Sequence, residues 1–97
     1  MIPGTAVFRR KDDVRFRIIA PEAIVVRQSG PEVLVLNEVG ARILERIDAG
    51  EDLATLVAGL AEEYDVDPRR LEGDAAAFIE ELTAGGVLEN VGAVDAV

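Results

Sequence analysis

The sequence predicts an α+β fold in a winged-helix-like order, with a three-stranded antiparallel sheet followed by a three-helix bundle. Up to residue 36, apolar side chains either alternate with basic ones or form short β-branched runs, as they do in strands. From residue 37 onward they recur every three or four positions, as on one face of a helix. The 97 residues are enough for one domain and too few for two.

Three segments of the first part are predicted strands. Residues 14–18 alternate apolar and basic side chains, residues 24–27 are β-branched except for Arg27, and residues 33–36 are entirely apolar. Turns are expected at Ala20-Pro21-Glu22 and at Ser29-Gly30-Pro31. Connections this short can join only antiparallel neighbours, because a parallel crossover needs about a dozen residues.

Three apolar stripes predict the helices. Asn37, Asp52 and Asp67 are suited to cap their N-termini, with Pro68 at the first helical position and Gly50 ending the first helix. The stripes are Val39, Ile43, Leu44 and Ile47; Leu53, Leu56, Val57, Leu60 and Tyr64; and Leu71, Ala75, Phe78, Ile79 and Leu82.

Two side-chain pairs on these helices are spaced for i,i+4 contacts. Glu38 and Arg42 are expected to pair on the exposed side of the first helix, and Arg70 and Asp74 can pair on the third. Gly85-Gly86 is expected to end the third helix.

The chain is expected to divide into three parts. Residues 1–13 look like an N-terminal arm with a short strand at Ala6–Arg9, residues 14–90 form the domain, and residues 91–97 form a loose tail. Val87-Leu88 is expected to fold back on the core.

The amino-acid composition excludes several classes of function. No cysteine is present, which excludes disulfides and thiolate chemistry, and neither a signal peptide nor an apolar run of membrane-spanning length is seen. A cytoplasmic protein without a membrane partner is therefore expected. Residues 1–28 carry six Lys or Arg and three Asp or Glu, a net charge of +3, whereas residues 29–97 carry four and sixteen, a net charge of −12. Residues 29–97 are acidic enough to repel the phosphate backbone of a nucleic acid, which argues against nucleic acid as a partner.

The residues available for chemistry are few. The chain has no His, Cys or Trp, and only one Lys, one Ser and one Tyr. The single serine, Ser29, is expected to serve the turn. Neighbouring carboxylates on a helix point about 100° apart and do not converge. We therefore expect no catalytic residue, no metal site and no cofactor, and predict that the protein is not an enzyme.

One feature does indicate a binding function. If Val33–Leu36 is an outer strand, its free main-chain groups form an open and unusually apolar edge. Such an edge can accept a peptide as an additional strand. The alternative is that this strand is simply part of the core, or that helix 3 or another chain covers it.

A family pattern runs through the same region. One segment reads Leu36-Asn37-Glu38-Val39-Gly40-Ala41-Arg42-Ile43-Leu44 and is followed by Asp48-Ala49-Gly50. Further pieces follow in order: Leu53–Leu60, Glu63-Tyr64, Asp74 with Phe78, Ile79 and Leu82, and Gly86-Val87-Leu88-Glu89. Together they resemble the PqqD-like family over about Val14 to Glu89. The chain departs from the pattern at Ala75, where the family has Val, and at Val35, near which many relatives have an aromatic residue.

The resemblance implies a non-catalytic peptide chaperone, or RiPP recognition element. Such domains bind the leader segment of a ribosomally made precursor peptide and deliver it to a modifying enzyme. That enzyme is often of the radical-SAM type, as in pyrroloquinoline quinone (PQQ) biosynthesis, or is a leader peptidase in lasso-peptide pathways. The leader adds as a strand in the cleft between the third predicted strand and the third helix. The implied peptide-binding residues are Val33, Leu34, Val35, Leu36, Arg70, Asp74, Ala77, Phe78 and Glu81.

Two other functions remain open on sequence alone. A winged-helix DNA-binding regulator is suggested by Arg69-Arg70 at the start of the third helix, although that helix also carries four carboxylates. A homo-oligomeric interaction module would use the open edge for pairing between copies. The protein is accordingly expected to be a monomer or a strand-exchanged homodimer.

Overall fold

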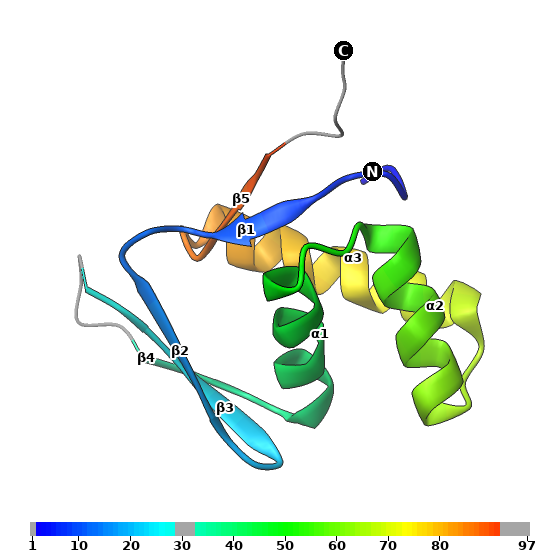
Figure 1. Ribbon diagram of the computed structural model, residues 1–97, viewed down its shortest axis with the longest axis horizontal. Helices are drawn as coiled ribbons and strands as arrows, with labels where there is room; N and C mark the ends of the chain where they lie inside the picture. Colours follow the sequence, from blue (N-terminus) through cyan, green and yellow to red (C-terminus); the bar gives the residue numbers. More distant parts are fainter. Residues whose placement is uncertain (1, 29–32, 92–97) are drawn as a thin grey trace.

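The computed structural model describes residues 2–28 and 33–91. They form two small sheets and three helices, arranged as Figure 1 shows. The elements are β1 (Phe8–Arg10), β2 (Val14–Ile19), β3 (Glu22–Arg27), β4 (Val33–Leu36), α1 (Glu38–Asp48), α2 (Leu53–Tyr64), α3 (Pro68–Ala84) and β5 (Leu88–Asn90). The α+β class and a three-stranded antiparallel sheet followed by three helices are confirmed, and β1 and β5 add a second, two-stranded sheet.

The larger sheet has the strand order β2-β3-β4, and both neighbouring pairs are antiparallel. A two-residue turn, Ala20–Pro21, joins β2 to β3, and its peptide bond is cis. Pairing of Ile19 with Glu22 closes this turn, so each strand extends closer to the proline than the sequence analysis expects. The turn expected at Ser29-Gly30-Pro31 lies outside the described residues.

The three predicted helix N-caps are confirmed. Asn37 Oδ1 accepts from the N–H of Gly40 at 2.9 Å, and Asp52 Oδ1 accepts from the N–H of Thr55 at 2.8 Å. Asp67 Oδ1 accepts from the N–H of Arg69 at 3.0 Å. Each bond satisfies a donor that the first turn of a helix leaves without a partner, so the helices begin where the sequence predicts.

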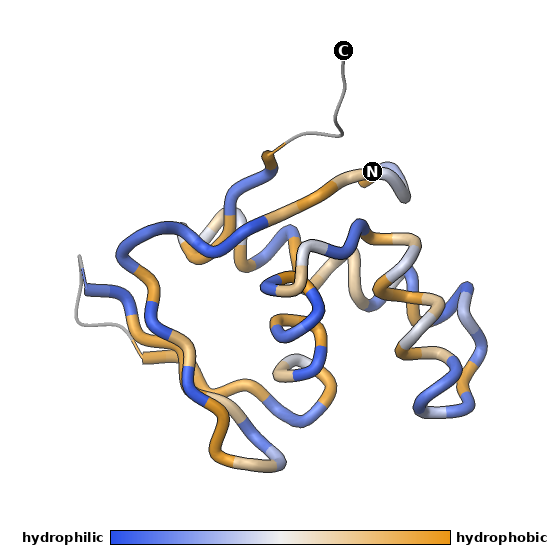
Figure 2. Tube along the Cα trace, in the orientation of Figure 1, coloured by the Kyte–Doolittle hydropathy of each residue, from blue (hydrophilic) through white to orange (hydrophobic). Residues whose placement is uncertain are grey.

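One face of the larger sheet packs on α1, which contacts both β3 and β4. Ala23, Val25 and Leu36 are buried on this face. Figure 2 shows hydrophobic residues recurring along the strands and helices, as their predicted stripes require. The most completely buried large side chains are Leu44, Leu53, Leu56, Leu60, Ile79, Leu88, Val25 and Val87. No helix in the described part of the chain combines the length and hydropathy needed to cross a membrane.

The first residues take part in the fold more closely than an arm would. The strand expected at Ala6–Arg9 is found at Phe8–Arg10, where it pairs antiparallel with β5. The side chains of Ala6 and Phe8 are buried in the core. Sequence periodicity does not reveal this contact, because the strand is only three residues long and its partner lies eighty residues away. Apart from Val91, the predicted tail lies outside the described residues.

Candidate functional site

The outer strand of the larger sheet, β4, leaves one side without a strand partner in the described residues. Its side chains are apolar throughout, yet most are exposed: Val33 is 57% exposed, Leu34 38% and Val35 66%. Leu36 is buried and anchors the strand to α1. An uncharged, apolar edge of this kind is one that proteins normally cover or use.

The hydrogen-bond pattern determines which groups of β4 face the open side. The N–H of Gln28 donates to the carbonyl of Asp13 at 2.8 Å, so these opposite residues form a hydrogen-bonded pair. Hydrogen-bonded and non-bonded pairs alternate along an antiparallel ladder. Along β3, the main-chain groups of residues 22, 24, 26 and 28 therefore point toward β2, and those of residues 23, 25 and 27 point toward β4. Ala23 lies opposite Leu36 and Val25 opposite Leu34, so Leu34 and Leu36 direct their main-chain groups toward β3. The N–H and C=O groups of Val33 and Val35 therefore point away from the sheet, toward any incoming strand.

Beside this edge lies a hollow of about 430 Å³, which we call the β4–α3 groove. Val35 and Leu36 border it on the strand side, and Asp74 and Phe78 border it on the helix side. The remaining lining residues are Asn37, Val39, Gly40, Ile43, Leu71 and Ala75. The size and the largely apolar lining are typical of a ligand pocket.

Gly40 allows the wall and floor of the groove to approach each other. A Cβ atom at this position would lie 3.1 Å from Cζ of Phe78 and 3.3 Å from Cβ of Leu36. Either distance is tighter than ordinary van der Waals contact. The first turn of α1 can therefore pack closely against β4 and α3 because residue 40 has no side chain.

Two further hollows involve the same strand or helices. One, of about 490 Å³, is lined by the preceding residues of β4 and the end of α3 and shares no residue with the groove; its lining is Val33, Leu34, Glu81, Leu82 and Gly85. The other, of about 530 Å³, adjoins the groove and shares Val39, Leu71 and Asp74 with it. Tyr64, Val66, Asp67 and Arg70 complete the lining of this second hollow.

The structure brings most of the predicted peptide-binding residues to this region. Val33, Leu34, Val35 and Leu36 lie along one side, and Asp74, Phe78 and Glu81 along the other. Arg70 lies at one end and, among the described residues, forms no ion pair with Asp74, unlike the expected i,i+4 contact. Ala77 borders a different hollow, with Ile2 and Ala76 on another flank of α3.

Sequence reasoning did not assign the groove floor, which is formed by Val39, Gly40 and Ile43 of α1. Val39 and Ile43 stood out only as part of a core stripe, and Gly40 only as part of a family pattern. The available signal was the glycine one residue after an apolar position in the first turn of a helix, where alanine would be more favourable. That choice is explained by the close approach of Phe78.

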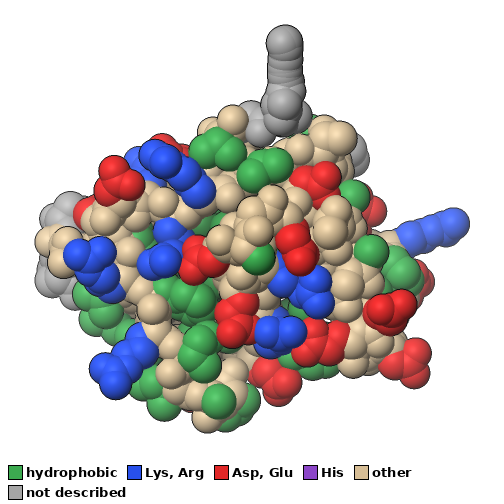
Figure 3. Space-filling view, in the orientation of Figure 1, with side chains coloured by type: hydrophobic (Ala, Val, Ile, Leu, Met, Phe, Trp, Pro, Cys, Tyr) green, Lys and Arg blue, Asp and Glu red, His purple; other side chains and the backbone are tan. Residues whose placement is uncertain are grey.

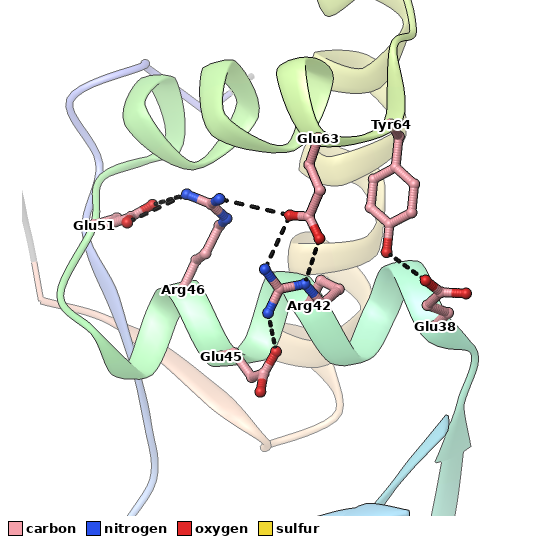
Figure 4. Close-up of polar contacts among 7 residues, drawn as sticks. All are labelled: Glu38, Arg42, Glu45, Arg46, Glu51, Glu63 and Tyr64. Atoms are coloured by element: carbon pink, nitrogen blue, oxygen red, sulfur yellow. Dashed lines mark hydrogen bonds and ion pairs between the residues drawn. The ribbon is translucent and has the colours of Figure 1, made fainter. Parts of the chain in front are cut away.

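A polar cluster holds α1 against the end of α2 (Figure 4). Arg42 makes a bidentate contact with Glu63, through Nη2 to Oε1 at 2.9 Å and Nε to Oε2 at 3.0 Å, and also pairs with Glu45. Tyr64 Oη donates to Oε2 of Glu38 at 3.0 Å. The expected pairing of Glu38 with Arg42 is therefore wrong, because the planar guanidinium finds a better-matched carboxylate across the helix interface.

This cluster also includes Arg46, which lies between the two helices. Its Nη1 atom is 3.1 Å from Oε1 of Glu51, and its Nη2 atom is 3.7 Å from Oε1 of Glu63. Since α1 carries the groove floor and α2 leads into Val66, these contacts fix the floor relative to the hollow at the groove's end.

Charge in the cluster alters several pKa values. The bidentate hydrogen bonds from Arg42 lower the pKa of Glu63, and the same carboxylate, with Glu45, raises the pKa of Arg42. Burial and the hydrogen bond to Glu38 raise the pKa of Tyr64. The hydrogen bond to Glu38 thus favours the protonated phenol, which is its donor.

Glu63 provides a test of this cluster. A carboxyl group whose pKa is lower in the folded than in the unfolded state stabilises the fold above the unfolded value of about 4.3, and this contribution is lost as the pH falls through the folded value. We expect Arg42→Gln to raise the pKa of Glu63 toward its ordinary value, measured by NMR titration of the carboxyl carbon. Arg69→Gln, outside the cluster, should leave it unchanged; an unchanged pKa in Arg42→Gln would refute the assignment.

The lining of the groove supplies groups that can hold an apolar ligand. It offers apolar walls, the carboxylate of Asp74 and free main-chain groups beside an open strand edge, and the carboxylate of Glu81 lies in the neighbouring hollow. Within residues 2–28 and 33–91, no group of three acidic side chains is placed to hold a metal ion.

Comparison with known proteins points to one family. A family model described as coenzyme PQQ synthesis protein D (PqqD) matches residues 22–88, which include β3, β4 and all three helices. A comparison with curated proteins gave no match.

Three solved structures share the fold. One described as TbiB1 in complex with the TbiA(beta) leader peptide is 26% identical, with a TM-score of 0.80, covering 90% of this chain and 99% of that one. A lasso peptide synthetase B1 complexed with the leader peptide is 24% identical, with a TM-score of 0.78 and coverages of 84% and 96%. The PqqD truncation of Methylobacterium extorquens PqqCD, described as a stand-alone RiPP recognition element, is 22% identical, with a TM-score of 0.76 and coverages of 92% and 95%.

Proposed function

The chain belongs to the PqqD family, and from that membership we propose that it binds the leader segment of a ribosomally made precursor peptide and presents it to a modifying enzyme. It would act as a non-catalytic adaptor in the cytoplasm, with a winged-helix-like arrangement of α2, α3 and the sheet. The open edge of β4 beside the groove is the observation that carries this proposal. The similar structures described as leader-peptide complexes support it.

Binding would proceed by addition of a strand to β4. The N–H and C=O groups of Val33 and Val35 would pair with the peptide backbone and supply affinity that depends little on sequence. Successive peptide side chains would point alternately into the groove and away from it. The apolar wall at Phe78 and the carboxylates of Asp74 and Glu81 would then select among peptides.

Isothermal titration of the folded protein with the precursor peptide encoded beside its gene tests the proposal. We expect a Kd of about 1 μM or tighter, equivalent to about −8 kcal/mol. A scrambled leader of the same composition is the control, since it has the same charge and the same main chain. No binding to the native leader, or equal binding to the scrambled one, would sink the proposal.

The groove wall gives a sharper prediction. Removing the half-buried ring of Phe78 in Phe78→Ala should weaken binding of the precursor peptide about tenfold, or ~1.4 kcal/mol, because an apolar wall is lost. Ala77→Ser changes the adjacent residue of α3, which borders a different hollow, and should leave the affinity within twofold. Titration calorimetry on both variants compares them. Equal losses would place the peptide elsewhere.

Pairing of β4 with another copy of the chain is the second candidate function. The same exposed, apolar strand favours it. Molecular mass measured by light scattering over a range of protein concentrations separates the two: a concentration-dependent dimer that excludes the leader supports self-pairing.

A further inference from the structure

The face of the larger sheet turned away from α1 carries apolar side chains without a cover. The strand register places Ile24 beside Val35 and Val26 beside Val33 on this face. Val33 and Val35 are largely exposed, and Ile19 at the end of β2 is 53% exposed. We define the outer face as Ile19, Ile24, Val26, Val33 and Val35 together with Arg15 and Arg17.

Two arginines border this apolar surface. Arg15 lies opposite Val26 and Arg17 opposite Ile24, and both are exposed. In the part of the chain that the structure describes, neither forms an ion pair. Figure 3 shows basic side chains mostly on the side of the molecule that carries the strands, whereas acidic ones gather over the helices. Both guanidinium groups are therefore solvent-exposed and able to pair with carboxylates of another molecule.

We propose that the outer face is the docking surface for a separate protein whose contact patch is apolar at its centre and bordered by Asp or Glu side chains. The inference rests on the proposed function, in which this partner is the enzyme that processes the bound precursor. Apolar contact would supply the buried centre of the interface, and the arginines would pair at its rim. The acidic helical side repels such a partner, so the basic border also orients its approach.

A second copy of this chain fits the outer face less well. Among the described residues, the outer face of a second copy would offer only Glu22 and Asp13 as carboxylates for Arg15 and Arg17, and Asp13 already interacts within its own chain. Burying charges without partners is costly. The charge pattern therefore favours an acidic partner over a face-to-face dimer.

The outer face and the peptide site belong to one sheet. A strand added to β4 would direct half of its side chains into the groove and the other half onto the outer face, beside Val33 and Val35. A partner docked there would touch the domain and the leader together. Leader and partner would then strengthen each other's binding by the same factor.

The test uses the purified processing enzyme encoded with the precursor, and a charge-reversed variant of the full chain. The double substitution Arg15→Glu with Arg17→Glu should weaken enzyme binding at least tenfold by biolayer interferometry. A matched control, Lys11→Glu with Arg69→Glu, changes the net charge equally away from the outer face and should stay within twofold. Thermal unfolding shows that both variants are folded.

Titration with the precursor peptide separates this inference from the proposed function. Both double variants should bind the leader as the wild type does, because neither alters the groove. If the wild type does not bind the leader, the proposed function is refuted. The affinity of the wild type and the two variants for the enzyme would still test the outer face independently. The inference is overturned if the enzyme does not bind the wild type, or if both double variants lose enzyme affinity equally.

Discussion

Replacing Val35 with proline is expected to abolish binding of the precursor peptide while leaving the domain folded. Proline has no N–H to donate, and its ring would occupy the space in which the incoming strand must approach. Because the N–H of Val35 points to the open side of β4, no bond within the sheet is lost. Affinity should fall by at least about 100-fold, or ~2.7 kcal/mol, in titration calorimetry.

Two neighbouring substitutions make this result specific. Leu34→Pro removes an N–H that points toward β3, so it should destabilise the sheet itself. Val35→Thr keeps both the β-branched shape and the N–H and should retain peptide binding. If Val35→Pro folds and binds the leader with wild-type affinity, the peptide does not pair with β4.

The largest effect on stability is expected from Leu44→Ala. Leu44 is fully buried in α1, the helix that contacts β1, β3, β4 and α2. Truncation would leave a cavity in the core, and the free energy of unfolding should fall by about 3 kcal/mol. Tm should fall by roughly 12–24 °C, as measured by calorimetry or circular dichroism.

Val66→Ala is the matched control for this truncation. Val66 is 44% exposed in the connection between α2 and α3, so its free energy of unfolding should change by less than about 0.5 kcal/mol. A comparable loss in both variants would mean that the core is not centred on α1.

Features that depend on local chemistry could be predicted from the sequence. Asn37, Asp52 and Asp67 cap helices where they were expected to, because a cap is decided by a few consecutive residues. Val33–Leu36 forms a strand with the predicted bounds, since its run of apolar residues ends directly at the cap of α1. Periodicity also separated the strand half of the chain from the helical half.

Features that depend on distant partners could not be predicted. Nothing near Phe8 indicates that it pairs with Asn90, and nothing near Arg42 indicates that Glu63 is a better partner than Glu38. For the groove, helical spacing placed Asp74 and Phe78 on one face but gave no means to separate Ala77 from them. The family pattern indicated where the proposed site lies, whereas the close packing of Gly40 against Phe78 joins two helices and is encoded in no local pattern.

The antiparallel pairing of β1 with β5 brings the two ends of the domain to one place. Phe8 lies opposite Asn90, in a small sheet separate from the one that contains β4. A second domain fused at either end would thus be tethered at the same point, away from the edge of β4 at which we propose that the leader binds. A short flexible linker would hold such a fused enzyme at a local concentration on the order of millimolar, so that even weak docking would be nearly saturated. The pairing of β1 with β5 would therefore permit the proposed adaptor function both in a free domain and in a domain fused to an enzyme.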